Sequence, residues 1–105
     1  FSAQAGHAQP AVDLYEDDHH YFARLELPGV KKDSIDLELE NSVLTVSREE
    51  SKKAKSGEAN YSFSRSIAVP DGVDLSKVEA RFEDGVLTVT LPKEEARKPR
   101  QISVK

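Results

Sequence analysis

The sequence predicts an all-β protein, an antiparallel β-sandwich of two sheets. Residues 35–47 (IDLELENSVLTVS) and 78–90 (VEARFEDGVLTVT) repeat one pattern at an offset of 43 residues, and each copy alternates apolar and polar side chains around a tight turn. Each copy therefore has one apolar face, and two such faces bury best against each other as two sheets. Turn signals that recur every eight to twelve residues also favour this fold class.

Two extended segments precede the first hairpin. Pro10 opens the first of them at residues 11–15, and a longer strand follows at residues 19–27, in which alternate side chains are apolar. Pro28 and Gly29 end this strand, because proline removes a donor from the ladder and glycine permits a positive φ.

A charged loop and one more strand lie between the two hairpins. Residues 49–60 (EESKKAKSGEAN) contain no residue that is expected to be buried. The strand at residues 61–69 alternates apolar side chains with small ones, and Arg65 falls in register with the apolar set. A buried guanidinium persists only when it is paired. Arg65 therefore either reaches past the sheet edge to water or contacts a second subunit, and the pattern leaves both interpretations open.

The length of 105 residues suits one domain. We expect residues 10–92 to form the sandwich, residues 1–9 to be the remnant of a flexible N-terminal arm, and residues 93–105 to form a C-terminal tail. Helix is expected only as short turns near residues 75–77 and 94–97.

Composition argues against several classes of function. A net charge of −4 does not suit non-specific nucleic-acid binding, since phosphate neutralisation needs a basic surface. No apolar run approaches membrane-spanning length, so no membrane partner is expected. The absence of cysteine fits a reducing, cytoplasmic location. Because the chain begins at Phe1 and contains no methionine, we expect it to be a fragment that lacks its natural N-terminal segment.

The sequence offers few candidates for catalysis. Three histidines occur, His7, His19 and His20, without the motifs that would accompany them in an active site. The run Asp17-Asp18-His19-His20 carries metal-ligand atoms, but adjacent residues of a strand face opposite ways, so a solvated polar turn is the better interpretation. Acidic residues of the hairpins are the outward partners of apolar neighbours. We therefore expect no enzyme, no metal site and no cofactor.

The tail carries two apolar residues among polar ones. Ile102 and Val104 point the same way in an extended segment, about 7 Å apart, and burial of each would contribute roughly 1.5–3 kcal/mol before ordering costs. An exposed sheet edge beside an apolar groove is a suitable docking place for such a segment. The hairpin arms are candidate edges, and their inward side chains would line the groove: Ile35, Leu37 and Leu39 in one arm, and Val78, Ala80 and Phe82 in the other. If these side chains are sealed in the core instead, the tail is only a tether.

Three motifs and one pattern give the chain a resemblance to a known family. The motifs are residues 27–30 (LPGV), 63–70 (FSRSIAVP) and 85–92 (GVLTVTLP), and residues 80–87 add the pattern A-x-x-x-x-G-V-L. From Pro10 to the C-terminus the chain resembles the small heat-shock proteins, with their α-crystallin domain and I-x-V tail. The resemblance implies an immunoglobulin-like β-sandwich and an ATP-independent holdase, which binds partly unfolded client proteins and prevents their aggregation.

The resemblance also implies roles for particular residues. In bacterial and plant members the loop that matches residues 49–60 carries a strand that is swapped onto a partner to form a dimer, although this loop has few strand formers here. Arg65 matches the family's arginine near the dimer contact, which favours the subunit interpretation. Ile102 and Val104 match the tail motif that docks in a neighbour's groove, and the matching groove residues are Leu37, Leu39, Val78, Ala80 and Phe82.

The expected partners are a second copy of the chain, further copies in a homo-oligomer, and unfolded client proteins. Family members carry a longer apolar N-terminal arm, which only residues 1–9 could represent, so dimers with reduced holdase activity are expected of this chain.

Two other functions stay open. One is a co-chaperone adaptor on the same sandwich, which would bind a folded chaperone. The other is a sandwich enzyme or a carbohydrate-binding module, although the lack of tryptophan leaves few platforms for stacking sugars.

Overall fold

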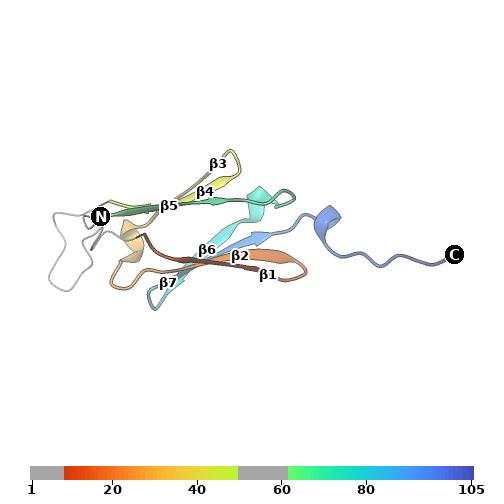
Figure 1. Ribbon diagram of the computed structural model, residues 1–105, viewed down its shortest axis with the longest axis horizontal. Coiled ribbons are helices and arrows are strands. Elements are labelled where there is room, and N and C mark those ends of the chain that lie inside the picture. Colours follow the sequence, from red (N-terminus) through yellow and green to blue (C-terminus); the bar gives the residue numbers. More distant parts are fainter. Residues whose placement is uncertain (1–8, 50–61) are drawn as a thin grey trace.

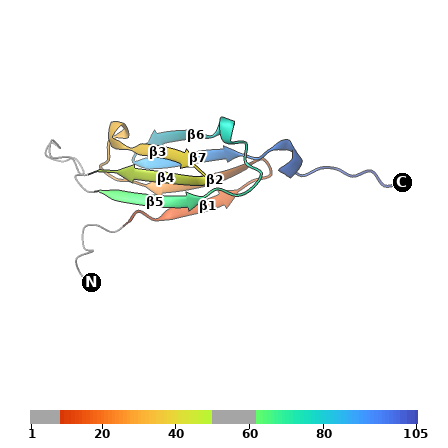
Figure 2. The ribbon, with the colours of Figure 1, turned by 90° about the horizontal axis from the view of Figure 1, so that it is seen from above.

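The fold is a sandwich of two antiparallel sheets, as the sequence predicts. A computed structural model describes residues 9–49 and 62–105, and within these ranges seven strands form two layers (Figures 1 and 2). The four-stranded sheet has the order β1-β2-β7-β6, with β1 at Val12–Glu16, β2 at His20–Glu26, β7 at Val86–Pro92 and β6 at Glu79–Glu83. The three-stranded sheet has the order β3-β4-β5, with β3 at Asp36–Glu40, β4 at Val43–Arg48 and β5 at Phe63–Ala68.

The two similar hairpins lie in different sheets. The β3–β4 hairpin turns at Asn41 and Ser42, which both have a positive φ, of 52° and 60°. The β6–β7 hairpin turns at Asp84 and Gly85, with φ of 51° and 76°. Turns in which both central residues have a positive φ match the right-handed twist of the flanking strands. In each hairpin the first arm, β3 or β6, is left at the edge of its sheet.

The core fills the space between the layers. Along β2 the alternation predicts one buried face, and Ala23 and Leu25, like Leu27 just beyond the strand, are fully buried. The strand β7 lies between β2 and β6, and its register places Leu87 opposite Leu25 and Val89 opposite Ala23. The remaining core side chains come mainly from the three-stranded sheet and its flanks: Val30, Leu44, Val46, Phe63, Ile67, Val69, Val73 and Leu91.

Within the described ranges the chain also forms three short 3₁₀ turns, two between strands and one after β7. Those at Leu75–Lys77 (η3) and Glu95–Arg97 (η4) confirm the helical turns that the sequence predicts. The third, Lys32–Ser34 (η2), was not predicted, and it leads from the loop after β2 into β3. Its last residue, Ser34, donates its hydroxyl to the carbonyl oxygen of Lys31 at 2.8 Å, a local bond that favours a tight turn.

Candidate functional site

An open groove lies between the two sheets on the side where β3 and β6 form the edges. Its cavity has a volume of about 180 Å³ and is lined by Lys32, Ile35, Leu37, Ala80, Phe82 and Leu87. Leu37 is 38% exposed, and Ile35 and Phe82 are partly buried against the core. No strand described by the structure covers either edge. The groove therefore combines apolar walls with two rows of free backbone groups, which is the surface that an extended peptide needs.

The five residues that sequence reasoning assigned to this groove divide into two groups. Leu37, Ala80 and Phe82 line the cavity itself. Leu39 and Val78 do not line it and instead pack, partly buried, against the core. The structure thus brings the two hairpin arms together across one slot, and it keeps that slot open along only part of its length.

The tail that carries Ile102 and Val104 leaves the sandwich after β7 and runs away from it (Figure 1). These side chains are 80% and 97% exposed. Both side chains expose apolar surface to water. Docking of the tail on another surface would remove that apolar surface from water, which is favourable. Neither contacts the groove within its own chain.

The root of the tail is firmly attached to the end of the sandwich. Lys93 Nζ donates to Glu16 Oε2 at 2.6 Å and to the Asp17 carbonyl oxygen at 2.9 Å, and it lies 4.8 Å from the centroid of the Tyr21 ring. The hydrogen bond to the Glu16 carboxylate raises the pKa of Lys93 above its ordinary value. The direction in which the tail leaves is therefore set by contacts to β1 and β2.

A second set of contacts continues this attachment. Glu94 donates its backbone N–H to the carbonyl oxygen of Gly72 at 2.7 Å. Gly72 has a φ of 85°, and a Cβ at this position would collide with the side chain of Arg97. Lys98 Nζ donates to Glu95 Oε1 at 2.8 Å, which lowers the pKa of Glu95. The chain becomes free of side-chain and backbone partners only after Lys98.

Arg65 lies on the inner face of β5, as its register in the sequence predicts. Its neighbours on that face are Phe63 and Ile67, both buried. The Nε atom of Arg65 is buried and has no hydrogen-bond partner among residues 9–49 and 62–105. A buried donor of this kind is unfavourable unless an acceptor reaches it. Because β5 is an edge strand, such an acceptor can come from a second molecule.

A second buried arginine was missed by the sequence reasoning. Arg48, at the end of β4, is only 4% exposed, and its Nε donates to Ser34 Oγ at 3.1 Å. The signal was available, since Leu44, Val46 and Arg48 follow one another at every second position and therefore share the inner face. This arginine joins the end of β4 to the turn that leads into β3, and so it supports one wall of the groove.

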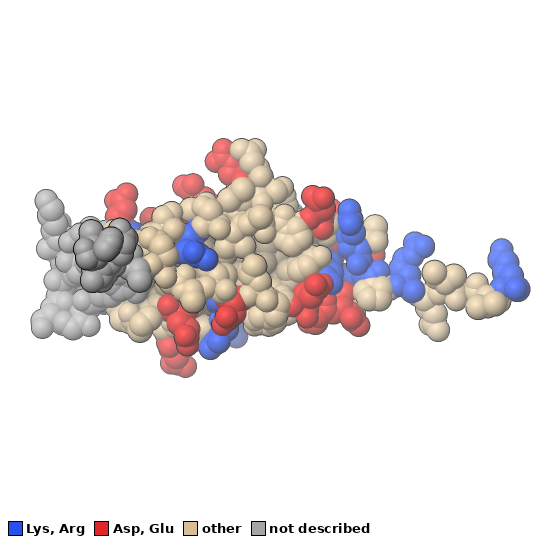
Figure 3. Space-filling model, viewed as in Figure 1, with Lys and Arg blue, Asp and Glu red and all other residues tan. Residues whose placement is uncertain are grey.

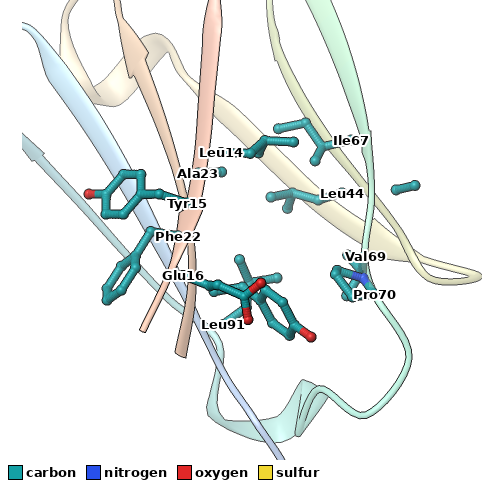
Figure 4. A pocket seen from close by; sticks show the side chains of 12 residues that line it. Leu14, Tyr15, Glu16, Phe22, Ala23, Leu44, Ile67, Val69, Pro70 and Leu91 are labelled. Carbon is teal, nitrogen blue, oxygen red and sulfur yellow. The ribbon is translucent and has the colours of Figure 1, made fainter. Parts of the chain in front are cut away.

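The opposite side of the sandwich has a cavity of its own, which sequence reasoning also missed. It lies between β1 and β5, has a volume of about 170 Å³, and is lined chiefly by apolar side chains. Figure 4 shows Leu14, Leu44 and Ile67 between the layers, with Val69 and Pro70 on one side and Leu91 toward its lower end. Leu14 is 64% exposed at its rim. Both open sides of the sandwich are thus apolar.

The acidic and histidine run before β2 forms a polar turn. Asp17 Oδ1 accepts the backbone N–H groups of His19 at 2.8 Å and His20 at 2.7 Å, and it lies 3.2 Å from His20 Nδ1. These hydrogen bonds, that of His19 first, lower the pKa of Asp17. In the described ranges no group of three or more histidine, cysteine or acidic side chains is arranged to hold a metal ion. His7 lies outside the described residues.

Residues 49–60, the predicted swapped segment, lie almost wholly outside the described ranges, so the structure gives no account of a strand there. Among the helices that it does describe, none has the length and apolar character needed to cross a bilayer.

Comparison with known proteins decides the family. Residues 13–105 match the Hsp20/alpha crystallin family. The chain belongs to this family. As a small heat-shock protein it is a member of a family of chaperones, and the resemblance seen in its motifs is confirmed.

Individual relatives agree in sequence and in fold. Small heat shock protein C4 of Rickettsia felis is 36% identical over an alignment of 103 positions, which covers 90% of this chain and 63% of that protein. Heat shock protein 16 of Schizosaccharomyces pombe is 37% identical over an alignment of 111 positions, gaps included, which covers 95% of this chain and 78% of the relative. The chain thus spans less than two thirds of the length of the Rickettsia protein.

Solved structures give the same result. Heat shock protein 16.0 from S. pombe superposes with a TM-score of 0.71 at 34% identity, over 93% of this chain and 76% of that one. A small heat-shock protein from Xylella fastidiosa, described as having a distinct high order structure, superposes with a TM-score of 0.73 at 26% identity, over 93% and 97% of the two chains. The two-sheet sandwich is therefore the α-crystallin domain.

Proposed function

We propose that this small heat-shock protein is an ATP-independent holdase, which binds partly unfolded proteins through apolar surface and keeps them from aggregating. The observation that carries the proposal is the pairing, in one chain, of an open apolar groove and a tail with two exposed apolar side chains. Binding of this kind needs no reacting group, and the proposal includes no catalytic step and no cofactor.

The tail and the groove supply a way to assemble. Ile102 and Val104 of one copy enter the groove lined by Leu37, Ala80 and Phe82 of another, while the tail backbone pairs with an edge strand. The contact made by each of these two side chains is weak. In an assembly many tails dock at once, and the subunits stay together because each docked tail holds the others near their grooves. When tails leave, the same groove becomes apolar surface to which an unfolded client can bind. The high order structure of the Xylella protein is in keeping with such assembly.

A dimer is proposed as the unit of this assembly, with Arg65 at its contact. Within the described part of the chain the buried Nε of Arg65 has no hydrogen-bond partner, and an acceptor from a second copy would satisfy it. This observation supports the subunit interpretation over the alternative that the side chain simply reaches water past the sheet edge. The swapped segment at residues 49–60 and the cytoplasmic location stay predictions.

The experiment that tests the proposal measures light scattering from a heat-labile enzyme, with the protein added and no ATP present. Suppression of scattering at near-equimolar ratios is expected. No suppression at any ratio would instead favour the co-chaperone adaptor, which needs a folded partner rather than an unfolded client.

The variant Ile102→Gly with Val104→Gly is expected to lose assemblies larger than a dimer in native mass spectrometry while the thermal unfolding of the domain stays unchanged. An unchanged oligomer distribution would rule out tail docking.

A further inference from the structure

The rim of the β3–β6 groove is acidic. On β3, Asp36, Glu38 and Glu40 alternate with the inward leucines and point to solvent. Within residues 9–49 and 62–105 none of these three carboxylates has an ion-pair partner. Across the groove, β6 adds the exposed Glu79 and Glu83, of which Glu83 lies 3.5 Å from Arg81 Nε, so the unpaired acidic row is the one on β3. The groove itself is lined at one place by the basic Lys32. Figure 3 shows acidic side chains over the β3–β4 hairpin at the top of the molecule.

The tail has the opposite charge. Residues 96–105 contain four basic side chains and no acidic one, and two of them, Arg100 and Lys105, flank the apolar pair. Basic side chains follow the tail in Figure 3. Because Arg100 and Lys105 are exposed and make no ion pair in the described part of the chain, both are available to a partner.

From this complementarity we propose that the β3 carboxylates form an electrostatic rim that selects the basic tail of a second copy and makes its docking depend on ionic strength. The inference rests on the proposed function. It adds an attraction between charged side chains to the apolar contact between tail and groove. In an extended tail, Lys105 alternates with Ile102 and Val104, so it points out of the slot when they point in. If the docked tail pairs as a strand with β3, Lys105 lies beside the outward carboxylates of β3, among them Glu38. Opposite charges on neighbouring strands attract each other.

The occupant is the tail of another copy, because the tail of the same chain is directed elsewhere. Lys98 has an extended backbone, with φ of −77° and ψ of 151°, and the following Pro99 favours this conformation. Between Lys98 and Ile102 there is no glycine or asparagine to reverse the chain. Figures 1 and 2 show the tail leaving along the long axis of the sandwich, away from both edges of the groove.

Charge-exchange variants of the full chain test this inference. Glu38→Lys on the rim and Lys105→Glu on the tail are each expected to weaken tail docking about two- to fivefold, and the double exchange is expected to recover most of the loss. Glu26→Lys is the matched control, since Glu26 is also exposed on a strand, has no partner in the described ranges, and changes the net charge equally. The measurement is the oligomer distribution in sedimentation velocity as a function of protein concentration.

Salt gives the second readout. Raising NaCl from about 0.05 M to about 0.5 M shortens the screening length severalfold, so wild-type assemblies are expected to shrink while the double exchange behaves like the wild type. The inference is overturned if Glu26→Lys changes the oligomer distribution as much as Glu38→Lys does. It is also overturned if neither salt nor the charge exchanges change that distribution. Lys105→Glu lies on the exposed tail and keeps the test valid if a rim variant fails to fold. If Ile102→Gly with Val104→Gly abolishes assembly while the charge variants leave it unchanged, apolar tail docking is supported and the electrostatic rim is contradicted.

Discussion

Leu37 and Ala80 occupy the same position in the two hairpin copies, and they line one cavity from opposite sheets. The repeat in the sequence is therefore also a relationship in space, because each copy leaves its first arm at an edge and turns that arm's apolar face toward the other. The small side chain of Ala80 opposite the half-exposed Leu37 leaves room for a docked residue.

Blocking this cavity is expected to stop tail docking. Ala80→Gln places an amide where the tail's apolar side chains would lie, and burial of that amide without a partner is expected to weaken docking about fivefold or more. Thr88→Gln is the matched control, because it places the same side chain on the outer face of the neighbouring strand β7, opposite Arg81, without changing the charge of the groove rim. Native mass spectrometry should show smaller assemblies for the first variant only. Equal distributions for the two variants would contradict the assignment of the groove.

Arg65→Met is expected to weaken the dimer without harming the monomer. The substitution removes a buried donor that has no partner within the described chain, so thermal unfolding of the isolated subunit should stay the same or move to higher temperature. The dimer dissociation constant should rise about thirtyfold or more if the guanidinium is bonded across the contact. Analytical ultracentrifugation over a dilution series measures it. Arg24→Met, at a partly exposed arginine on β2 that lies 3.8 Å from Asp13, serves as control, and a similar constant for both variants would assign Arg65 no subunit role.

Ser34→Ala is expected to destabilise the domain by about 1–3 kcal/mol, because Arg48 is buried and its Nε would lose the hydroxyl that accepts its hydrogen bond. Urea unfolding monitored by tyrosine fluorescence measures the free energy of unfolding. Ser66→Ala, on the exposed face of β5, makes the same chemical change at a hydroxyl that has no hydrogen bond within the described residues, and it should stay close to the wild type. A loss below a few tenths of a kcal/mol in Ser34→Ala would show that this hydroxyl does not matter to Arg48.

Acid is expected to loosen the turn before β2 through Asp17. Backbone hydrogen bonds hold the pKa of Asp17 below its ordinary value of 3.8 in the folded state. The carboxylate therefore contributes stability that is fully present above the unfolded pKa and is lost as the pH falls through the lower folded pKa. Asp17→Asn keeps an oxygen acceptor but cannot titrate, so its thermal midpoint should depend less on pH between about pH 4 and pH 2. Asp18→Asn is the control, and identical slopes in both variants and the wild type would contradict this role.

Much of this protein follows from local pattern. Alternation fixes which side chains of each strand face inward, and the inward positions of Leu25, Val89 and Arg65 follow from it without further information. The tight turns follow from Asn41 and Gly85, which tolerate a positive φ. The motifs of residues 27–30, 63–70 and 85–92, together with the pattern of residues 80–87 and the I-x-V tail, indicated the family.

The partners of the buried polar atoms could not be predicted in this way. Arg48 meets Ser34 only because the turn before β3 folds back over the end of β4. Lys93 meets Glu16, 77 residues away in sequence, only because β2 lies between β1 and β7 and the end of β7 passes the β1–β2 turn. Both contacts depend on the order of strands in a sheet, which no short pattern specifies.

Taken by itself, the sequence determined the two faces of every strand, the positions of the turns and the spacing of the two apolar tail residues, since each depends on neighbours a few positions apart. Only the tertiary structure decided between the two possibilities for the hairpin arms, open edges or sealed core. It places β3 and β6 as edge strands on the same side, packs Leu39 and Val78 against the core while Leu37 and Ala80 stay open, and adds a second apolar cavity with Leu14 at its rim. The physical reason is that an edge exists only after all the other strands have paired, and pairing between distant segments is a property of the whole chain.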